Sequence, residues 1–432
     1  MFDALFTTTT EYKKLSHALS GKGACALFGL PASGRAQVYA ALCRQLDKPL
    51  CIVTPGEAEA TRFAADLNTL GIPAAVFPAR DYVLRPIEGT AREYEYRRLA
   101  VLGELVGGRL RAVAVPAEAL TQFTTPKEDF CANTRTLHAG DTLLRDDLLA
   151  ALFGAGYTRR AQVDGPGQFS VRGDIVDIFA PDQKMPVRME FWGDEIDTLH
   201  TFDLTTQRRE DAIDKFYLSP AREVLFGKPA DAAEQLRAFL AKQRGKKKTA
   251  MTDCMAADLD LLDGGAVPVN MDKYLAVRYP HPATVLDYFD DPILVAEEPA
   301  SIREADRATA YRRGEELKSL ILDGVLCAGL DNLYADPSYL WSKTGHYRTI
   351  CAENFARSMP DQPLKDIINA PAHTLPAWNG EVAGLLEDLK PLCDAGYTVT
   401  LLAGTDRAAA GLARDLRDKG ILVTTDAAAA PA

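Results

Sequence analysis

The segment from residue 24 to residue 46 constrains the fold of this chain more than any other part of its sequence. It begins with an apolar run, ACALFG, that is typical of a buried strand, and it ends with helical apolar spacing in RAQVYAALCRQL. Between the two, Gly29 and Gly34 stand at the spacing of the phosphate-binding loop G-x-x-x-x-G-K-[ST]. A strand, a glycine loop and a helix in this order predict the frame of a P-loop nucleotide-binding domain.

The chemical groups of such a loop are replaced here. Arg35 and Ala36 stand where a lysine and a hydroxyl residue are needed. The planar guanidinium does not substitute for a compact ammonium, and alanine offers no oxygen to magnesium. The matching acidic strand end is best found in ILVAEEP, with Glu297 at the position of the magnesium aspartate and Glu298 after it. We therefore predict a degenerate site without catalytic residues, while a plain strand-to-helix turn remains the alternative.

Further strands and helices alternate along the first part of the chain, which is typical of a parallel sheet covered on both faces. After residue 125 the pattern changes to short alternating runs with turn signals and no helix between them, at 167–181 and 187–203. These runs predict an antiparallel β-meander that forms a separate insert. The α/β pattern resumes near 215, and a strand, a helix and a strand are expected at 398–404, 405–420 and 421–425.

The predicted fold class is therefore α/β. A parallel-sheet, degenerate P-loop-NTPase-like domain carries an inserted β-rich α+β domain and is followed by a further small α/β domain. The expected boundaries are 1–125 and 215–340 for the two parts of the first domain, 126–214 for the insert, and 345–432 for the small domain with its Ala-rich tail.

Composition limits the classes of function. The net charge of −11 argues against a protein that binds nucleic acid on its own. The basic run at 242–248 is better explained as a solvated loop at a helix end than as a nucleic-acid patch. The eight cysteines form no C-x-x-C pair and no zinc pattern, so we expect no metal. No secretory signal and no apolar run of about 18 residues is present, so a cytoplasmic location without a membrane span is expected.

The insert offers a candidate surface in VRMEFWGDE, residues 187–195. Arg188 and Trp192 share one face of the predicted strand, and Arg172 of the neighbouring strand can join them in one patch. Exposed Trp and Arg are common anchors of protein interfaces. In the alternative, Trp192 packs beneath another element and the arginines pair with Glu190 or Asp174. The pattern alone slightly favours this alternative, because single surface aromatics are common.

A resemblance to a known family favours the interface over this alternative. The stretch GQFSVRGDIVDIFAPDQKMPVRMEFWGDEIDTLHTFDLTTQR closely resembles the segment shared by bacterial transcription-repair coupling factors and the excision-repair subunit UvrB, and LSPAREVLF at 218–226 is similar to the return from that insert. UvrB has an intact phosphate loop and a long aromatic-rich hairpin, and this chain has neither. The chain is therefore more similar to the N-terminal module of the coupling factors, which kept the frame and lost the ATPase.

The resemblance implies a non-catalytic module whose insert docks the damage-recognition ATPase UvrA. The family's docking residues fall on Arg172, Arg188 and Trp192, although a phenylalanine is usual at the last position. It also implies that no cofactor is used, with neither ATP nor magnesium bound by this module. RNA polymerase, DNA and the ATP-dependent translocase of the family would depend on a C-terminal part that 432 residues do not supply. The alternatives are an active ATPase or helicase resembling UvrB, and direct binding of DNA by the first domain.

Overall fold

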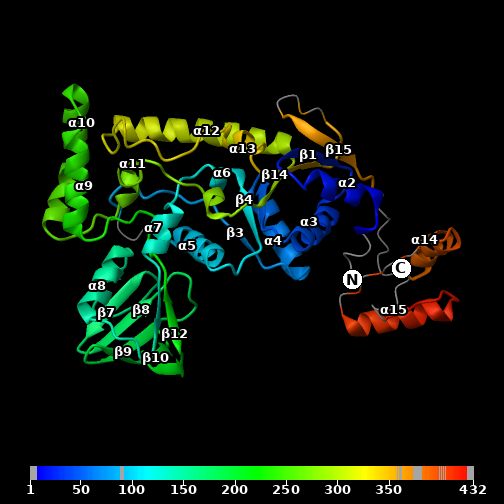
Figure 1. Cartoon of the computed structure of the whole chain (residues 1–432), viewed down its shortest axis with the longest axis horizontal. Helices are drawn as coiled ribbons and strands as arrows, with labels where there is room; N and C mark the ends of the chain where they lie inside the picture. Colours follow the sequence, from blue (N-terminus) through cyan, green and yellow to red (C-terminus); the bar gives the residue numbers. More distant parts are fainter. Residues whose placement is uncertain are drawn as a thin grey trace. The chain divides into compact units, whose positions relative to one another are not determined.

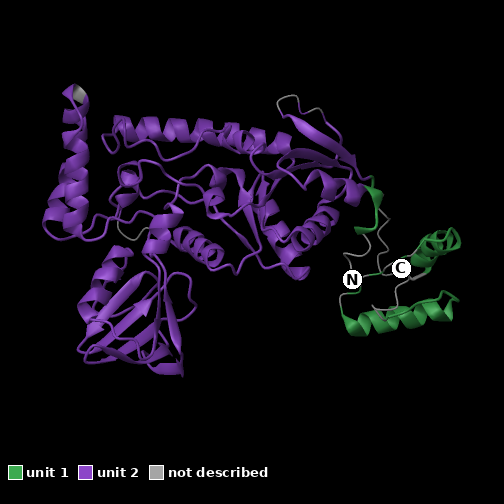
Figure 2. Ribbon diagram, viewed as in Figure 1, with its two compact units in different colours: residues 1–10, 371–432 green, residues 11–370 purple. Residues whose placement is uncertain are grey.

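The computed structural model describes residues 7–87, 92–357, 359, 362–372, 382–397, 399, 401, 403 and 405–425. The chain divides into two compact units, one of residues 11–370 and one of residues 1–10 with 371–432 (Figure 2). In the described part of the chain, every strand belongs to the larger unit.

The larger unit is built on a seven-stranded parallel sheet with the order β15-β1-β14-β13-β2-β4-β3 (Figure 1). The residues of the central strands are buried throughout, because helices cover both faces of the sheet. The predicted parallel α/β sheet is thus confirmed. The strands are β1 (Gly23–Phe28), β2 (Leu50–Thr54), β3 (Ala74–Val76), β4 (Ala112–Pro116), β13 (Ile293–Glu297), β14 (Arg348–Glu353) and β15 (Leu364–Asn369).

The helices of this unit follow the predicted alternation. The helix α4 packs on β3 and β4, and the long α12 runs beside the sheet against β13 and β14 (Figure 1). None of the helices in the described ranges has the length and apolarity that a membrane crossing requires. The helices are α2 (Thr10–Ala18), α3 (Ala32–Leu46), α4 (Glu57–Thr69), α5 (Glu93–Val106), α6 (Ala117–Leu120), α7 (Lys127–Ala132), α11 (Leu275–Arg278), α12 (Pro299–Leu322) and α13 (Tyr339–Lys343).

The strands β14 and β15 correct the boundary expected at residue 345. They flank β1 in the seven-stranded sheet, so residues 348–369 belong to the main sheet and not to a small C-terminal domain. Without β14, the buried strands β1 and β13 would have no neighbour on their facing edges. Backbone groups that lie in the core must be paired, and β14 supplies those partners.

The smaller unit contains α14 (Val382–Asp394) and α15 (Asp406–Asp418). The helix expected at 405–420 is confirmed, and its N-terminus is capped by the hydroxyl of Thr405, which accepts a hydrogen bond from the N–H of Ala408. The strand expected at 421–425 was wrong, since those residues are not in a strand. Alternate residues of the strand expected at 398–404, and the tail at 426–432, lie outside the described residues.

The insert forms a six-stranded sheet with the order β11-β10-β9-β8-β7-β6, which Figure 1 shows as a lobe joined to the rest near α7. The antiparallel meander predicted at 167–203 is confirmed by β7 to β10, while the short edge strand β6 is parallel to β7. The elements are β5 (Arg135–His138), α8 (Arg145–Gly154), β6 (Thr158–Arg159), β7 (Gln168–Arg172), β8 (Ile175–Phe179), β9 (Val187–Trp192), β10 (Glu195–Phe202), β11 (Arg209–Ala212) and β12 (Lys215–Leu218).

A helical pair follows the insert, and here the expected helix with a trailing basic loop was wrong. The helix α9 (Pro229–Ala241) ends before the basic run, and α10 (Gly245–Asp263) begins within it. Lysines in a first turn oppose the helix dipole. Packing sustains α10 instead, because Met251 and Met255 are buried in the same core cluster as Leu236 of α9.

Candidate functional site

The loop between β1 and α3 is short. Only residues 29–31 separate the strand from the helix, and Gly29 has a φ of 90°. Gly34, Arg35 and Ala36 already lie in α3, where the Arg35 N–H donates to the carbonyl of Pro31 at 3.0 Å. In a phosphate-binding loop such backbone N–H groups face the ligand. Here the helix itself uses this donor.

The structure brings together the two altered halves of the predicted site. The Nε of Arg35 lies 3.1 Å from the carboxylate of Glu297, and its Nη1 lies 2.9 Å from that of Glu298. Arg35 and Glu297 are buried, and the hydroxyl of Tyr39 donates to Glu297. The guanidinium is therefore held by the chain's own acids.

The electrostatics of this cluster depend on Glu297. Burial raises the pKa of Glu297 to about 7, against the opposing effects of Arg35 and of the hydrogen bond from Tyr39. Glu298 adopts a left-handed φ of 52° at the start of α12, an uncommon conformation for this residue type. No group of three or more His, Cys, Asp or Glu residues within the described ranges is arranged to hold a metal ion.

The three predicted docking residues lie on one face of the inserted sheet. Asp177 of β8 stands between Ser170 of β7 and Arg188 of β9 in the strand register. Arg172 lies two residues beyond Ser170, and Trp192 lies four residues beyond Arg188. Since alternate residues of a strand point to the same face, Arg172, Arg188 and Trp192 share the face of Asp177. We call these three residues the docking face.

The three side chains differ in how firmly they are held. Trp192 is 82% exposed at the end of β9, immediately before the turn at Gly193. Arg172 is exposed and donates to the carbonyl of Ala161 at 3.2 Å. The guanidinium of Arg188 donates to both carboxylate oxygens of Asp177, at 2.7 and 2.9 Å. The face thus combines a free indole, an exposed cation and a fixed cation.

The fixed cation is positioned from several sides. The carboxyl group of Asp177 is 1% exposed, and the ring of Phe202 lies 4.8 Å below the guanidinium of Arg188. A third donor of Arg188 reaches the carbonyl of Gln207 at 3.3 Å. A planar guanidinium bound by both forks to a carboxylate is restricted in rotation, so Arg188 is preorganised.

The alternative arrangement considered for these residues does not occur. Trp192 is not packed beneath another element, and Arg188 pairs with Asp177 and not with Glu190 or Asp174. The sequence analysis missed the role of Asp177. Its signal was available, because an acid on the polar side of the apolar strand IVDIF must find a cation if it is buried.

Comparison with known proteins assigns the insert to a family. The family model described as the UvrB interaction domain matches residues 136–224. These residues include β6 to β12 and therefore the whole six-stranded sheet with the docking face. The chain thus contains a UvrB interaction domain.

Curated relatives extend the match beyond the insert. The chain is 25% identical over 406 residues to the transcription-repair-coupling factor of Bacillus subtilis, covering 91% of this chain and 34% of the relative. The corresponding proteins of Myxococcus xanthus (35% over 208 residues; 46% and 17%) and Mycobacterium bovis (34% over 299 residues; 66% and 24%) are more similar over shorter stretches. The chain is therefore related to the transcription-repair-coupling factors, as the resemblance predicted, and it spans about a third or less of their length.

Proposed function

We propose that this chain is a non-catalytic module that recruits UvrA to stalled transcription complexes through the docking face. Its relatives are named transcription-repair-coupling factors, which supports a role in DNA repair. The observation that carries the proposal is the exposure of Trp192 on the sheet of a UvrB interaction domain. Contacts with RNA polymerase and DNA are proposed for parts of the relatives that this chain does not span, and the place of action is the cytoplasm.

The chemistry of the docking face supports protein binding. Tryptophan and arginine are the residue types most enriched among the anchors of protein interfaces. Trp192 presents a large apolar surface, and Arg188 is already fixed by Asp177, so little conformational entropy is lost when a partner binds. Arg172 adds an exposed charge that suits an acidic or carbonyl-rich partner surface.

The alternative function, an active ATPase or helicase, is opposed by the β1–α3 site. Arg35 is bound to Glu297 and Glu298, and Ala36 supplies no oxygen for magnesium. We therefore propose that this site neither binds Mg-ATP nor hydrolyses it. Phosphate release by the purified chain at millimolar Mg-ATP would refute this part of the proposal.

A calorimetric titration with UvrA tests the docking face. We expect Trp192→Ala and Arg172→Ala each to weaken binding by about 1–3 kcal/mol, the range of interface anchors. Tyr311→Ala is the matched control, since Tyr311 is a 74% exposed aromatic on α12 outside the inserted sheet. Equal affinity of the wild-type chain and Trp192→Ala, or equal losses in Trp192→Ala and Tyr311→Ala, would contradict the proposal.

A further inference from the structure

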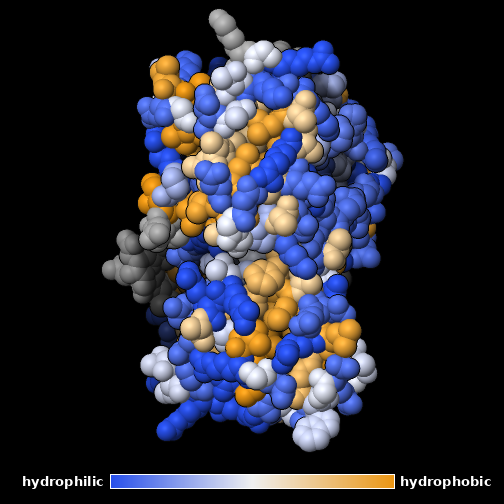
Figure 3. Space-filling view, turned by 90° about the vertical axis from the view of Figure 1, so that its left-hand side faces the viewer, coloured by the Kyte–Doolittle hydropathy of each residue, from blue (hydrophilic) through white to orange (hydrophobic). Residues whose placement is uncertain are grey.

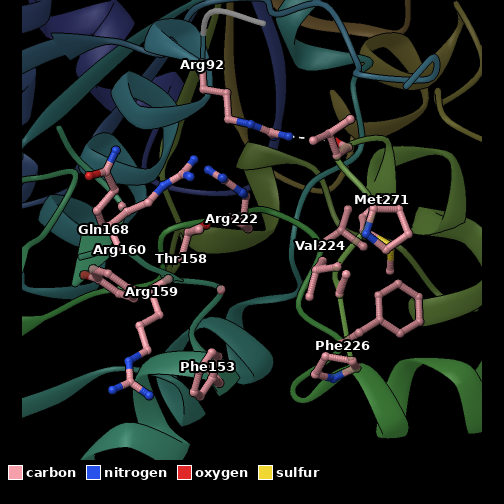
Figure 4. A pocket seen from close by; sticks show the side chains of 18 of the residues that line it. Arg92, Phe153, Thr158, Arg159, Arg160, Gln168, Arg222, Val224, Phe226 and Met271 are labelled. Carbon is pink, nitrogen blue, oxygen red and sulfur yellow. Dashed lines mark hydrogen bonds between the residues drawn. The ribbon is translucent and has the colours of Figure 1, made fainter. Parts of the chain in front are cut away.

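A pocket of about 890 Å³ lies where the inserted sheet meets the helical part of the larger unit. One side is formed by β6 and the loop to β7, and the other by the chain at 224–232 and 265–271 (Figure 4). Seen from the side of the molecule in Figure 3, apolar surface gathers between hydrophilic regions above and below it. This pocket is separate from both the docking face and the β1–α3 site, since it shares no residue with either.

One wall of the pocket is basic. Figure 4 shows the side chains of Arg160 and Arg222 pointing toward one another, with Arg159 directed away from them. Arg92 extends over the pocket and donates to the carbonyl of Val269 at 2.7 Å. Arg92 is neutralised by an ion pair with Glu95. Arg160 is exposed and makes no ion pair within the described part of the chain.

The acids of the pocket do not balance these charges. Asp272 is bound to Arg80 by an ion pair of 2.7 Å, which leaves Asp164 as the exposed carboxylate of the lining. Arg222 donates to the hydroxyl of Tyr96 at 3.1 Å, and the nearby carboxylate of Glu95 offsets part of its charge, so the uncompensated charge of this wall is mainly that of Arg160. A concentration of positive charge in a concave site of a chain with a net charge of −11 favours an anionic ligand.

The opposite wall is apolar. Val224, Phe226 and Met271 face the arginines across the pocket in Figure 4. The rim adds Val267, which is 56% exposed, and Val269, which is 39% exposed. A ligand that satisfies both walls must carry acidic groups along one side and bulky apolar groups along the other.

A sheet edge borders the pocket between these walls. Within the described strands, β6 is the last of the six-stranded sheet, and the N–H groups of Thr158 and Arg160 bond to carbonyls on the β7 side, at 2.9 and 2.8 Å. Successive N–H groups of a strand point to opposite sides, so the backbone of Arg159 faces away from β7. An outward N–H and C=O at a sheet edge can accept an added strand.

We propose that this pocket binds an extended peptide segment of a partner protein in which acidic and bulky apolar residues alternate. The segment adds to the edge at β6. Because side chains of an added strand alternate between faces, its acids meet Arg160 and Arg222 while its apolar residues meet Val224, Phe226 and Met271.

The test is fluorescence anisotropy of the whole chain with a labelled octapeptide in which Glu alternates with Leu. We expect saturable binding, and no binding of the corresponding Lys–Leu or Glu–Ser peptides. Lack of binding at millimolar chain concentration, or equal binding of the Glu–Ser peptide, overturns the proposal. Displacement of the Glu–Leu peptide by ADP or by a dT oligonucleotide at lower concentration than by unlabelled peptide would assign the pocket to a phosphate ligand and overturn it as well.

Variants separate the two walls and the edge. Arg160→Glu and Val267→Asp should each weaken peptide binding at least about tenfold, since each removes one half of the complementarity. Arg159→Pro should weaken it more than Arg159→Ala, because only proline removes the outward N–H while the bonds to β7 remain. Arg135→Glu, an exposed arginine outside the pocket, is the control. Equal effects of Arg160→Glu and Arg135→Glu, or of Arg159→Pro and Arg159→Ala, contradict the proposal; melting curves confirm that each variant is folded.

Discussion

The β1–α3 site and the docking face each contain an arginine paired with a carboxylate, but the two arginines differ in burial. In the first, Arg35 is buried and held by Glu297 and Glu298, so its charge is satisfied inside the chain. In the second, Asp177 is buried but Arg188 stays half-buried beside an exposed Trp192. Arg35 is thus enclosed between two acids, whereas the side chain of Arg188, which rests on Asp177, keeps 15% of its surface exposed.

The two arginine–carboxylate pairs also hold different parts of the molecule in place. At the β1–α3 site, the contact of Arg35 with Glu298 joins α3 to the start of α12. On the inserted sheet, the buried carboxylate of Asp177 keeps Arg188 in place. In both regions an arginine–carboxylate pair is present, and the two pairs differ in how far the arginine is buried.

The largest effect on stability is expected at the buried pair of Arg35 and Glu297. Above pH 7, where Glu297 is ionised, Arg35→Ala leaves its carboxylate buried without a cation, and breaking a buried pair in this way costs about 3–5 kcal/mol. We expect the free energy of unfolding of the larger unit, measured in urea, to fall by an amount in this range. The double variant Arg35→Ala/Glu297→Ala is the control and should recover much of the loss. A drop below 1 kcal/mol in Arg35→Ala would show that the pair does not join α3 to α12.

The pair on the docking face should respond asymmetrically. Arg188→Ala strands the carboxylate of Asp177 in the sheet and should cost about 2–3 kcal/mol of unfolding free energy. Asp177→Ala leaves an arginine that can extend into water, so about 1–2 kcal/mol is expected. The same urea experiment measures both variants. If the order is reversed, Arg188 is not merely supported by Asp177, and the contrast with Arg35 weakens.

Much of the fold follows from the sequence because the signals are local. The alternation of apolar runs and helical spacing predicted the parallel sheet, and the short runs after residue 125 predicted the meander of β7 to β10. The alternation of side chains along the strand VRMEFW was enough to place Arg188 and Trp192 on one face. Even the approach of Arg35 to Glu298 follows from the parallel sheet, because α3 and Glu298 follow the carboxyl ends of β1 and β13.

The remaining features depend on contacts distant in sequence. No local pattern shows that β14 lies between β1 and β13, because strand order is decided by packing. The start of α10 was missed since Gly245 and the following lysines read as a helix end, and only burial of Met251 and Met255 against α9 decides otherwise. The pocket beside β6 combines segments more than a hundred residues apart, so no local sequence motif predicts it.

The raised pKa of Glu297 predicts that the stability of the chain depends on pH. The pKa of Glu297 is raised to about 7 in the folded chain from an ordinary value of 4.5, mainly by burial. Between these two values the unfolded chain has lost the proton that the folded chain keeps, so stability falls as the pH rises. The slope due to this group is at most about 1.4 kcal/mol per pH unit. Glu297→Gln should remove this slope in urea unfolding between pH 5 and 7; an unchanged slope would mean that Glu297 stays ionised against Arg35.

The smallest effect on stability is expected at the most exposed residue. Trp192 is 82% exposed next to the turn at Gly193, so Trp192→Ala removes little buried surface and should change the unfolding free energy by less than about 0.5 kcal/mol. The urea experiment that measures Arg188→Ala provides this value under identical conditions. A loss above 1 kcal/mol would mean that the indole packs on the sheet and stabilises it. An interface anchor should lose UvrA affinity but little stability when it is replaced by alanine, whereas a structural aromatic should lose stability. The reason is that folding leaves the side chain of Trp192 in water, so only binding can bury it.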